Sequence, residues 1–244
     1  MKNYLENMKN KVAYITGGSK GIGFGIADAL MKQGVHVAIT SRTQSSADQA
    51  VEVLKSSNPN AKAIGIESDV RELKHQEKAV QKILNEFGQL DYVIANAGMG
   101  HYHSIEDLTE TQWKETIDTN LTGVFFSIKA SVEALKKSKG YFITISSLAG
   151  TNFFAKGSAY NASKFGVTGF TQAVMMDLRD YGVNVSTIMP GSVASHFNGN
   201  TPDESDAWKI QPEDLGELVV DLFKMNPRTL PSKVEVRPSQ PPKK

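Results

Sequence analysis

Short apolar runs alternate with amphipathic stretches along most of the chain, and this alternation constrains the fold more than any other feature of the sequence. The apolar runs are continuous and rich in Val and Ile, which is typical of strands covered by helices on both faces. The stretches between them repeat apolar residues at helical spacing. Strand–helix alternation predicts right-handed crossovers, so we expect an α/β protein with a doubly wound, seven-stranded parallel sheet and helices on both faces.

The expected elements follow from these runs. Strands are expected at Val12–Thr16, His36–Thr40, Ala63–Glu67, Tyr92–Ala95, Tyr141–Ser146, Asn184–Met189 and Lys233–Arg237. Helices are expected at about 21–33, 45–57, 72–87, 109–137, 158–181 and 212–225. A kink is expected in the helix at 109–137, because Asn120 is a poor residue for a helix interior and Gly123 follows it closely.

The length of the chain suits one domain. A chain of 244 residues can bury a full core, and no repeat, low-complexity tract or composition break marks a linker. We therefore predict a single domain over residues 1–244, with a flexible proline-rich tail at 238–244. The polar segment 192–212 leaves the carboxyl end of a predicted strand, where ligands bind in open α/β sheets. We expect this segment to act as a substrate lid, and the alternative is a plain surface loop.

Composition excludes several classes of protein and site. A net charge of +1 with 22% charged residues argues against a disordered acidic chain and against a strongly basic nucleic-acid binder. The sequence has no cysteine, which excludes disulfides, iron–sulfur clusters and thiolate metal sites. No apolar run approaches the ~18 residues of a membrane span, and the first ten residues lack the apolar region of a signal peptide. We expect a cytoplasmic protein that binds neither nucleic acid nor membrane.

A glycine-rich turn, Thr16–Gly23, follows the first predicted strand and opens directly into a helix. Gly17 permits a tight turn, while Gly21 and Gly23 let backbone amides approach a pyrophosphate at the helix N-terminus. The turn is not an ATP-type phosphate loop, because Lys20 precedes the last glycines and no Ser or Thr follows it to hold Mg²⁺. Its position in a β-α-β chain predicts a dinucleotide site.

The second predicted strand indicates which dinucleotide is bound. A site for NAD places a carboxylate about 20 residues after the glycines, on the ribose 2′-hydroxyl. Here the strand ends in Ser41 and Arg42, with no acid before Asp48. A guanidinium would hold a 2′-phosphate that a carboxylate would repel, and Lys20 can join Ser41 and Arg42 in that pocket. We therefore predict NADP(H) over NAD(H).

Tyr160 and Lys164 form the main catalytic pattern. Four residues apart on a helix, they project from the same face, and an ammonium beside a phenol lowers its pKa from about 10 toward neutrality. The phenol then becomes a usable general acid or base. Ser147 lies at the end of the fifth predicted strand and can donate to a substrate carbonyl. Ser146 is its neighbour, but alternate strand residues face opposite sides, so only one can point at the site.

These motifs together resemble the short-chain dehydrogenase/reductase family. Its TGxxxGxG motif is matched by Thr16–Gly23, and its YxxxK motif by Tyr160–Lys164. The family's NNAG appears with Ala95 in place of the first Asn, and its PGxVxT ends in Ser195 in place of Thr. The motif NxxG is matched from Asn120 onward. The resemblance spans residues 12–195 and implies a single-domain Rossmann fold.

The resemblance implies hydride transfer between nicotinamide and a carbonyl or alcohol, with these roles. Tyr160 would be the general acid/base, Ser147 would polarise the carbonyl, and Lys164 would lower the pKa of the phenol and hold the nicotinamide ribose. Asn120 would hold a water that links the lysine to solvent. The residues implied to bind NADP(H) are Gly17, Ser19, Lys20, Gly21, Ile22, Gly23, Ser41, Arg42, Asp69 (to the adenine amine), Val70 (on the adenine ring), Asn96, Ala97, Gly98, Tyr160, Lys164, Pro190, Gly191, Val193 and Ser195.

The substrate is left open by these motifs. A small carbonyl or alcohol is expected, and the alternatives are a 3-oxoacyl-[acyl-carrier-protein] reductase or a non-catalytic regulator that senses NADP(H). The segment 230–238 lacks the VDGG ending usual in 3-oxoacyl reductases, which favours a broader carbonyl reductase. The sequence 101–103 is HYH, but no further ligands lie in range, so no metal is expected. By resemblance, helices 109–137 and 158–181 are expected to build a homodimer or homotetramer.

Overall fold

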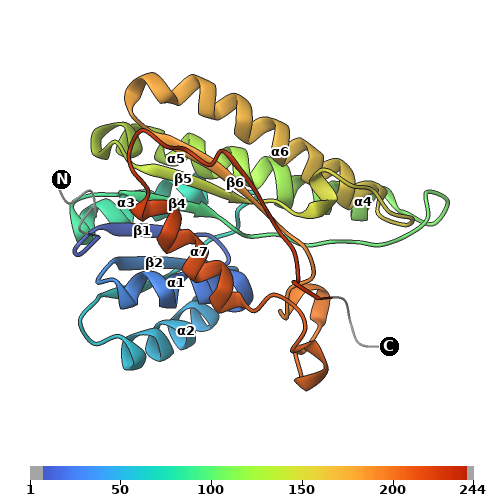
Figure 1. The fold of residues 1–244 in the computed structure, drawn as a ribbon, viewed down its shortest axis with the longest axis horizontal. Coiled ribbons are helices and arrows are strands. Elements are labelled where there is room, and N and C mark those ends of the chain that lie inside the picture. Colours follow the sequence, from blue (N-terminus) through green and yellow to red (C-terminus); the bar gives the residue numbers. More distant parts are fainter. Residues whose placement is uncertain (1–7, 241–244) are drawn as a thin grey trace.

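Seven parallel strands form one sheet in the order β3-β2-β1-β4-β5-β6-β7, as the computed structural model shows (Figure 1). The structure describes residues 8–240. The strands are β1 (Val12–Ile15), β2 (His36–Ser41), β3 (Ala63–Glu67), β4 (Tyr92–Ala95), β5 (Tyr141–Ile145), β6 (Asn184–Pro190) and β7 (Lys233–Val236). All seven predicted strands are confirmed, with ends that differ by one residue at most. The doubly wound, Rossmann-like fold is therefore confirmed as well.

Helices fill the connections between the strands. They are α1 (Gly21–Lys32), α2 (Gln44–Ser57), α3 (Leu73–Phe87), α4 (Glu110–Ile117), α5 (Gly123–Ser138), α6 (Ser158–Leu178) and α7 (Pro212–Lys224). The expected continuous helix at 109–137 is divided, because a π-helix over Asp118–Thr122 separates α4 from α5. Its location matches the kink expected near Asn120.

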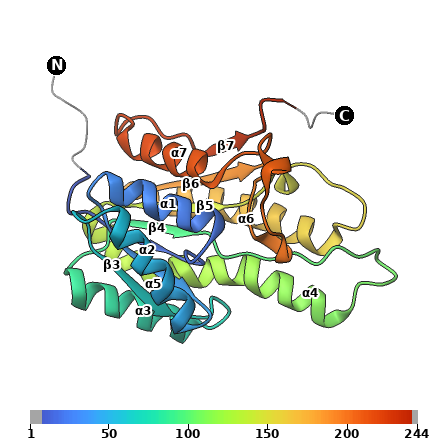
Figure 2. The ribbon, with the colours of Figure 1, turned by 90° about the horizontal axis from the view of Figure 1, so that it is seen from below.

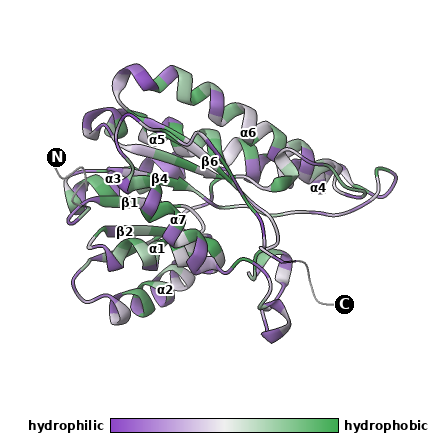
Figure 3. Ribbon diagram, viewed as in Figure 1, coloured by the Kyte–Doolittle hydropathy of each residue, from purple (hydrophilic) through white to green (hydrophobic). Residues whose placement is uncertain are grey.

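Two hydrophobic clusters cover the two faces of the sheet. Along β1, Ala13 and Ile15 belong to one cluster with α1 and α7, while Val12 and Tyr14 belong to the other with α3, α5 and α6. This alternation follows from the two-residue period of a strand. Figure 2 shows α1 and α7 on one side of the sheet and α3 and α5 on the other. The strands are accordingly coloured as mostly hydrophobic in Figure 3.

The carboxyl edge of the sheet gathers the segments that carry the predicted motifs. The strand order reverses between β1 and β4, and the glycine-rich turn follows β1 while residues 96–109 follow β4. At such a switch point two connections leave in opposite directions and open a crevice. The segment that follows β6, orange in Figure 1, lies at this same end of the molecule. The carboxyl edge is therefore where a ligand site is expected.

The two ends of the segment 192–212 are joined to each other at its base. Val193 pairs with Ile210 in an isolated parallel bridge, in which the amide of Ala194 donates to the carbonyl of Ile210 (2.9 Å). The amide of Ile210 donates in turn to the carbonyl of Ser192 (3.1 Å). The tail predicted at 238–244 is described only to residue 240, and residues 241–244 lie outside the described part, as do residues 1–7.

Candidate active site

A cleft of about 1610 Å³ opens at the carboxyl edge of the sheet. It is lined by the turn after β1, the loops after β4 and β5, the face of α6 and the segment after β6. Pockets for single small ligands usually measure about 300–1,000 Å³. The cleft therefore has room for a dinucleotide and a small substrate side by side.

The glycine-rich turn has the backbone geometry that its sequence predicts. Gly17 and Gly21 have φ values of 63° and 58°, in the left-handed region that favours glycine. At Gly23 a Cβ atom would lie 2.5 Å from Asn96 Nδ2, so a side chain there would displace the neighbouring loop. Helix α1 begins at Gly21, and its N-cap residue Lys20 makes no side-chain capping bond. The first turn of α1 thus presents backbone N–H groups toward the cleft, which suits a phosphate group.

Asn96 joins the loop after β4 to the glycine-rich turn. Its Nδ2 donates to the carbonyls of Thr16 (2.9 Å) and Gly17 (3.1 Å), and its amide donates to Thr16 Oγ1 (3.0 Å). The amide of Ala97 donates to the same hydroxyl (3.1 Å). Asn96 therefore links the segments that follow the neighbouring strands β1 and β4. The substituted position, Ala95, is a buried member of β4, and these bonds do not involve its side chain.

The polar residues expected at the adenine and 2′-phosphate end lie together in the cleft. Ser19, Lys20, Ser41 and Arg42 all line it, and the Ser19 and Ser41 hydroxyls are 3.4 Å apart. The resemblance places a 2′-phosphate among these residues. None of them is an acid, so the described lining here suits an anion.

Asp69 has a partner that the sequence did not indicate. Arg71 donates to its carboxylate through Nε (3.0 Å) and Nη2 (2.5 Å), and the Arg71 amide also donates to it (3.0 Å). These bonds hold the pKa of Asp69 below its usual value. The carboxylate stays ionised, but most of its hydrogen-bonding capacity is used inside the protein. An adenine amine would share Asp69 with Arg71, a restriction that the motif alone does not reveal.

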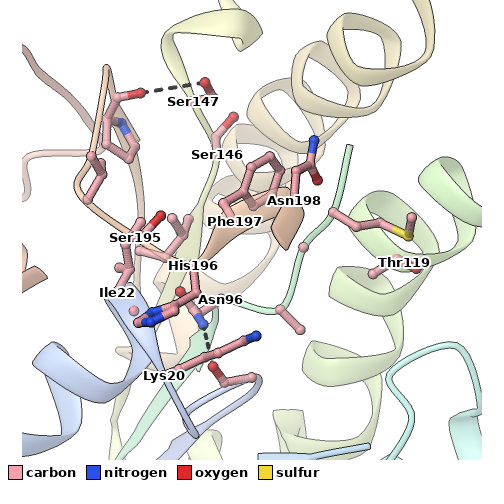
Figure 4. Close-up of a pocket in the computed structure, with 18 of the residues that line it drawn as sticks. Lys20, Ile22, Asn96, Thr119, Ser146, Ser147, Ser195, His196, Phe197 and Asn198 are labelled. Carbon is pink, nitrogen blue, oxygen red and sulfur yellow. Dashed lines mark hydrogen bonds between the residues drawn. The ribbon is translucent and has the colours of Figure 1, made fainter. Parts of the chain in front are cut away.

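Ser147 and Ser146 face different surroundings. The hydroxyl of Ser146 is buried and bonds to the carbonyl of Lys164 (3.1 Å) and to Thr168 Oγ1 (3.0 Å) on α6. Ser147 is only partly buried, and its hydroxyl lies 3.5 Å from the carbonyl of Pro190 in the cleft (Figure 4). The two hydroxyls therefore face different sides, as strand alternation predicts, and that of Ser147 is the more accessible.

The Tyr160 phenol is buried beside Ser147. Burial raises the pKa of Tyr160, and a hydrogen bond with Ser147 opposes that rise. The direction is opposite to the expectation that Lys164 would lower this pKa. Lys164 is 4% exposed, and its Nζ donates to the carbonyl of Ile145 (3.0 Å) instead of to the phenol. Its Nζ lies 5.6 Å from the centre of the Tyr160 ring.

Burial also acts on Lys164 itself and lowers the pKa of its ammonium to about 8. A buried cation without a carboxylate partner loses the hydration that stabilises its charge. The pKa values of the two groups are therefore shifted in opposite directions and lie farther apart than in water, since that of the phenol is raised and that of the amine is lowered. The dominant cause for both is desolvation, which the sequence spacing cannot show.

Asn120 ties three parts of the site together. It lies in the π-helix, is 1% exposed, and its Nδ2 donates to the carbonyl of Met99 (2.7 Å) and to Ser163 Oγ (3.0 Å). Its Oδ1 accepts from the amide of Met99 (2.8 Å). A Cβ at Gly98 would lie 3.4 Å from this Oδ1 and 3.6 Å from Lys164 Nζ. Asn120 is thus close to the lysine, but its side-chain amide is engaged by protein groups.

The segment after β6 reaches over the cleft from the glycine-rich turn to the loop after β4. A Cβ at Gly21 would lie 3.4 Å from the Cβ of Ser195. Farther along, Asn198 Oδ1 accepts from the amide of Gly100 (3.0 Å). Figure 4 shows the side chains of Phe197 and Asn198 within the cleft, on the same side as Ser147. Asn198 has a φ of 55°, and Gly199 follows with 78°.

Several lining residues were missed by the sequence reasoning. They are Met99, Leu148, Phe153, Phe154, Phe197, Asn198 and Trp208. The Asn198–Gly199 dipeptide carries a recognisable signal, because this pair favours left-handed backbone. The aromatic residues carry none, since apolar residues in loops follow no period.

The HYH sequence forms ordinary polar contacts. His101 Nε2 lies 2.9 Å from Glu115 Oε2, and His103 Nε2 lies 3.2 Å from the side-chain nitrogen of Gln112. Across residues 8–240, no three His, Cys, Asp or Glu side chains gather as metal ligands would. Within the same residues, none of the helices has both the length and the apolar composition needed to span a bilayer.

Known proteins are similar to this chain in both sequence and architecture. A family model described as short chain dehydrogenase matches residues 11–206. An uncharacterized oxidoreductase of Staphylococcus saprophyticus is 33% identical over 96% of this chain and 100% of that protein. The trans-4-hydroxycyclohexanecarboxylate dehydrogenase of Sinomonas cyclohexanicum is 34% identical over 91% of this chain and 89% of that protein.

A solved structure agrees with these relatives. The alcohol dehydrogenase from the archaeon Thermococcus sibiricus, in complex with 5-hydroxy-NADP, superposes with a TM-score of 0.87 at 27% identity, covering 96% of this chain and 99% of that one. The family model covers most of the described residues. The chain belongs to the short chain dehydrogenase family of oxidoreductases.

Proposed function

We propose that this protein is an NADP(H)-dependent oxidoreductase that transfers a hydride between nicotinamide and a carbonyl or alcohol substrate, with Tyr160 as general acid/base. The observation that carries the proposal is the meeting of Ser147, Tyr160 and Lys164 in one cleft with the glycine-rich turn. These side chains come from the end of β5 and from α6, far from the turn in sequence. A protein that only sensed the nucleotide would have no need of this set.

The described lining fits a dinucleotide in an extended pose. The backbone of Gly21–Gly23 would hold the pyrophosphate, and Ser41 and Arg42 would hold a 2′-phosphate. The region near Val193 and Ser195 would orient the nicotinamide carboxamide. Bound in this way, the cofactor supplies or accepts the hydride.

The protein's own groups would handle the proton. In the reductive direction the Tyr160 hydroxyl would protonate the forming alkoxide, and the Ser147 hydroxyl would donate to the carbonyl oxygen. The raised pKa of Tyr160 keeps the phenol protonated near neutral pH, which suits reduction. Lys164, beside the ring, would stabilise the phenolate after proton transfer and contact the nicotinamide ribose. Asn120 would hold the water of the proton relay near Lys164.

The segment 192–212 would serve as the lid over this site. Its two ends are joined by the bridge between Val193 and Ile210. Midway along it, the side chain of Asn198 accepts a hydrogen bond from the amide of Gly100. Closure of such a segment excludes water from the reacting groups. A dinucleotide at the glycine-rich turn would lie beneath Ser195.

We also propose that the protein assembles as a homodimer or homotetramer through α4, α5 and α6. Large apolar side chains remain exposed on these helices, at Trp113 (42%), Phe125 (42%), Phe165 (44%) and Met176 (50%). Exposed aromatic residues at this density are typical of interfaces.

The test of the proposed function is a steady-state assay of NADPH and NADH oxidation with a panel of aldehydes and ketones. We expect catalysis with NADPH and a kcat/KM at least tenfold higher for NADPH than for NADH. Arg42→Ala should remove most of that preference by raising the KM for NADPH, because the 2′-phosphate loses its guanidinium. Lys62→Ala, which alters a cation outside the cleft, is the matched control. Equal or better efficiency with NADH would contradict the cofactor assignment.

A further inference from the structure

Aromatic rings from three separate segments gather around the Tyr160 phenol. The Tyr102 ring lies edge-on to Tyr160 with centroids 5.4 Å apart, and Phe197 lies edge-on with centroids 5.8 Å apart. The ring centroids of Phe154 and Tyr102 are 5.8 Å apart. We call Tyr102, Phe154 and Phe197 the aromatic wall. It combines the loop after β4, the loop after β5 and the proposed lid.

Gly100 allows two of these rings to meet. A Cβ at this position would lie 3.0 Å from Tyr102 Oη and 3.1 Å from Tyr160 Cδ2. A side chain at this position would therefore press on both rings and require them to shift slightly. The amide of Gly100 also bonds to Asn198, next to Phe197. Gly100 therefore contacts Tyr102 in the loop after β4 and, through its bond to Asn198, the segment that carries Phe197.

The wall leaves ring surface uncovered although it lines the cleft. Phe154 is 49% exposed and Tyr102 is 40% exposed, and the neighbouring Phe153 is 86% exposed. Rings that packed against one another only for stability would be buried more fully. Apolar surface that remains open in a concave site is typical of a surface that a ligand covers.

Charge is distributed unevenly along the cleft. Lys20, Arg42 and Arg71 lie at the nucleotide end. Glu115, which also lines the cleft and lies near Arg71, is paired with His101 (2.9 Å), and Arg237 is paired with Glu235 (3.0 Å). The three side chains of the wall are uncharged, and the ammonium of the nearby Lys164 is buried and donates to the carbonyl of Ile145. An anionic group placed there would lose its hydration without gaining a partner.

We infer that the substrate carries its carbonyl on a flat, uncharged ring, which packs against the aromatic wall while the carbonyl oxygen meets Ser147 and Tyr160. This inference rests on the proposed function and names its substrate class. An aromatic ring gains edge and face contacts with the wall in addition to its buried area, whereas an alkyl chain gains only the area. Ring substrates are therefore favoured over straight-chain ones of equal carbon number.

The experiment compares kcat/KM with saturating NADPH for benzaldehyde, heptanal and 4-carboxybenzaldehyde, and adds acetoacetyl-coenzyme A as a 3-oxoacyl thioester. Phe197→Leu and Phe154→Leu are assayed beside the unchanged protein. Phe87→Leu is the matched control, because it makes the same change on α3, outside the cleft and outside the helices of the proposed assembly. Retained NADPH binding shows that each variant is folded.

We expect the benzaldehyde-to-heptanal ratio to fall about three- to tenfold in each wall variant and to stay unchanged in Phe87→Leu. The ratio is used because intrinsic aldehyde reactivity cancels between proteins. The 4-carboxy compound should be at least tenfold poorer than benzaldehyde in the unchanged protein.

Two different results would be adverse, and they can be told apart. An unchanged ratio in both wall variants, or a thioester turned over faster than benzaldehyde, would overturn the ring inference while leaving hydride transfer intact. NADPH oxidation with none of the four compounds would contradict the proposed function itself, and the ring inference would fall with it.

Discussion

At the scale of single residues, desolvation governs the behaviour of the proposed catalytic pair. Tyr160 and Lys164 are both buried, and burial disfavours the charged form of each. The pKa of the phenol is therefore raised, and that of the ammonium is lowered to about 8. Holding Lys164 charged at neutral pH costs folding free energy, which is the usual consequence of building a polar site into a core.

That cost predicts a specific pH dependence of stability. Below about pH 8 the folded protein contains a buried ammonium, while the unfolded chain keeps its lysine protonated up to its ordinary pKa of 10.5. Between these values the unfolded state binds more protons, so rising pH relieves the penalty. Lys164→Met should be the more stable protein at pH 7, and its advantage should shrink by about 2 kcal/mol by pH 9.5.

Urea denaturation at several pH values measures this difference. Lys62→Met, which removes a lysine outside the cleft, is the control. Its free energy of unfolding should change with pH as that of the unchanged protein does. A constant difference between Lys164→Met and the unchanged protein from pH 7 to 9.5 would show that Lys164 titrates as an exposed lysine does.

The sequence predicted which residues come together in the cleft better than it predicted their hydrogen-bond partners. Spacing alone placed Tyr160 and Lys164 on one helix face. Strand alternation indicated that only one of Ser146 and Ser147 points at the site, and the family resemblance implied Ser147. The pair of Arg71 with Asp69 was not predictable, because Arg71 has no periodic or motif signal. The direction of the Tyr160 pKa was wrong for a related reason, since burial depends on the whole surrounding core.

At the scale of elements, local hydrophobic patterns predicted the strands and helices correctly where an element buries a regular face against the core. Continuous Val and Ile runs fix the strands because both faces of the sheet are covered. The helix at 109–137 was the exception. Its π-helix depends on the bonds of Asn120 to Met99 and Ser163, which are distant in sequence. A local pattern indicates that such a helix is perturbed but not how its hydrogen bonds change.

The proposed lid predicts a kinetic effect at Asn198. Asn198→Gly removes the side chain that accepts from Gly100 while keeping a residue suited to positive φ. Because one hydrogen bond contributes about 0.5–1.5 kcal/mol, NADPH should dissociate roughly two- to tenfold faster. Stopped-flow displacement of NADPH, followed by its fluorescence, measures this rate.

Asn10→Gly is the matched control, since Asn10 also has positive φ (68°) but lies outside the cleft. It should leave the dissociation rate unchanged. If Asn198→Gly released NADPH at the rate of the unchanged protein, the segment 192–212 would be a surface loop and not a lid.

At the scale of the whole molecule, different parts of the sheet serve stability and ligand binding. Its two faces bury the two hydrophobic clusters, and its carboxyl edge holds the cleft. The apolar surface that remains on α4, α5 and α6 exceeds what these clusters need. This surface is the basis of the proposed assembly.

Phe165→Glu tests the assembly by placing a charge on that surface. We expect light scattering after size exclusion to give a dimeric or tetrameric mass for the unchanged protein and a monomeric mass for the variant, because a desolvated carboxylate opposes association. Ile105→Glu adds the same charge to an exposed apolar residue in the loop before α4 and should leave the mass unchanged. A monomeric mass for the unchanged protein would contradict the proposal.

The central claim is that Tyr160 transfers the proton during hydride transfer beside a bound nicotinamide cofactor. Tyr160→Phe tests it most directly, because the change removes one hydroxyl and keeps the buried ring. With a carbonyl that the unchanged protein reduces, turnover should fall by a factor of about 10²–10⁴, as expected for loss of a general acid. NADPH affinity, measured by fluorescence titration, should change less than about threefold. Turnover equal to that of the unchanged protein would contradict the account.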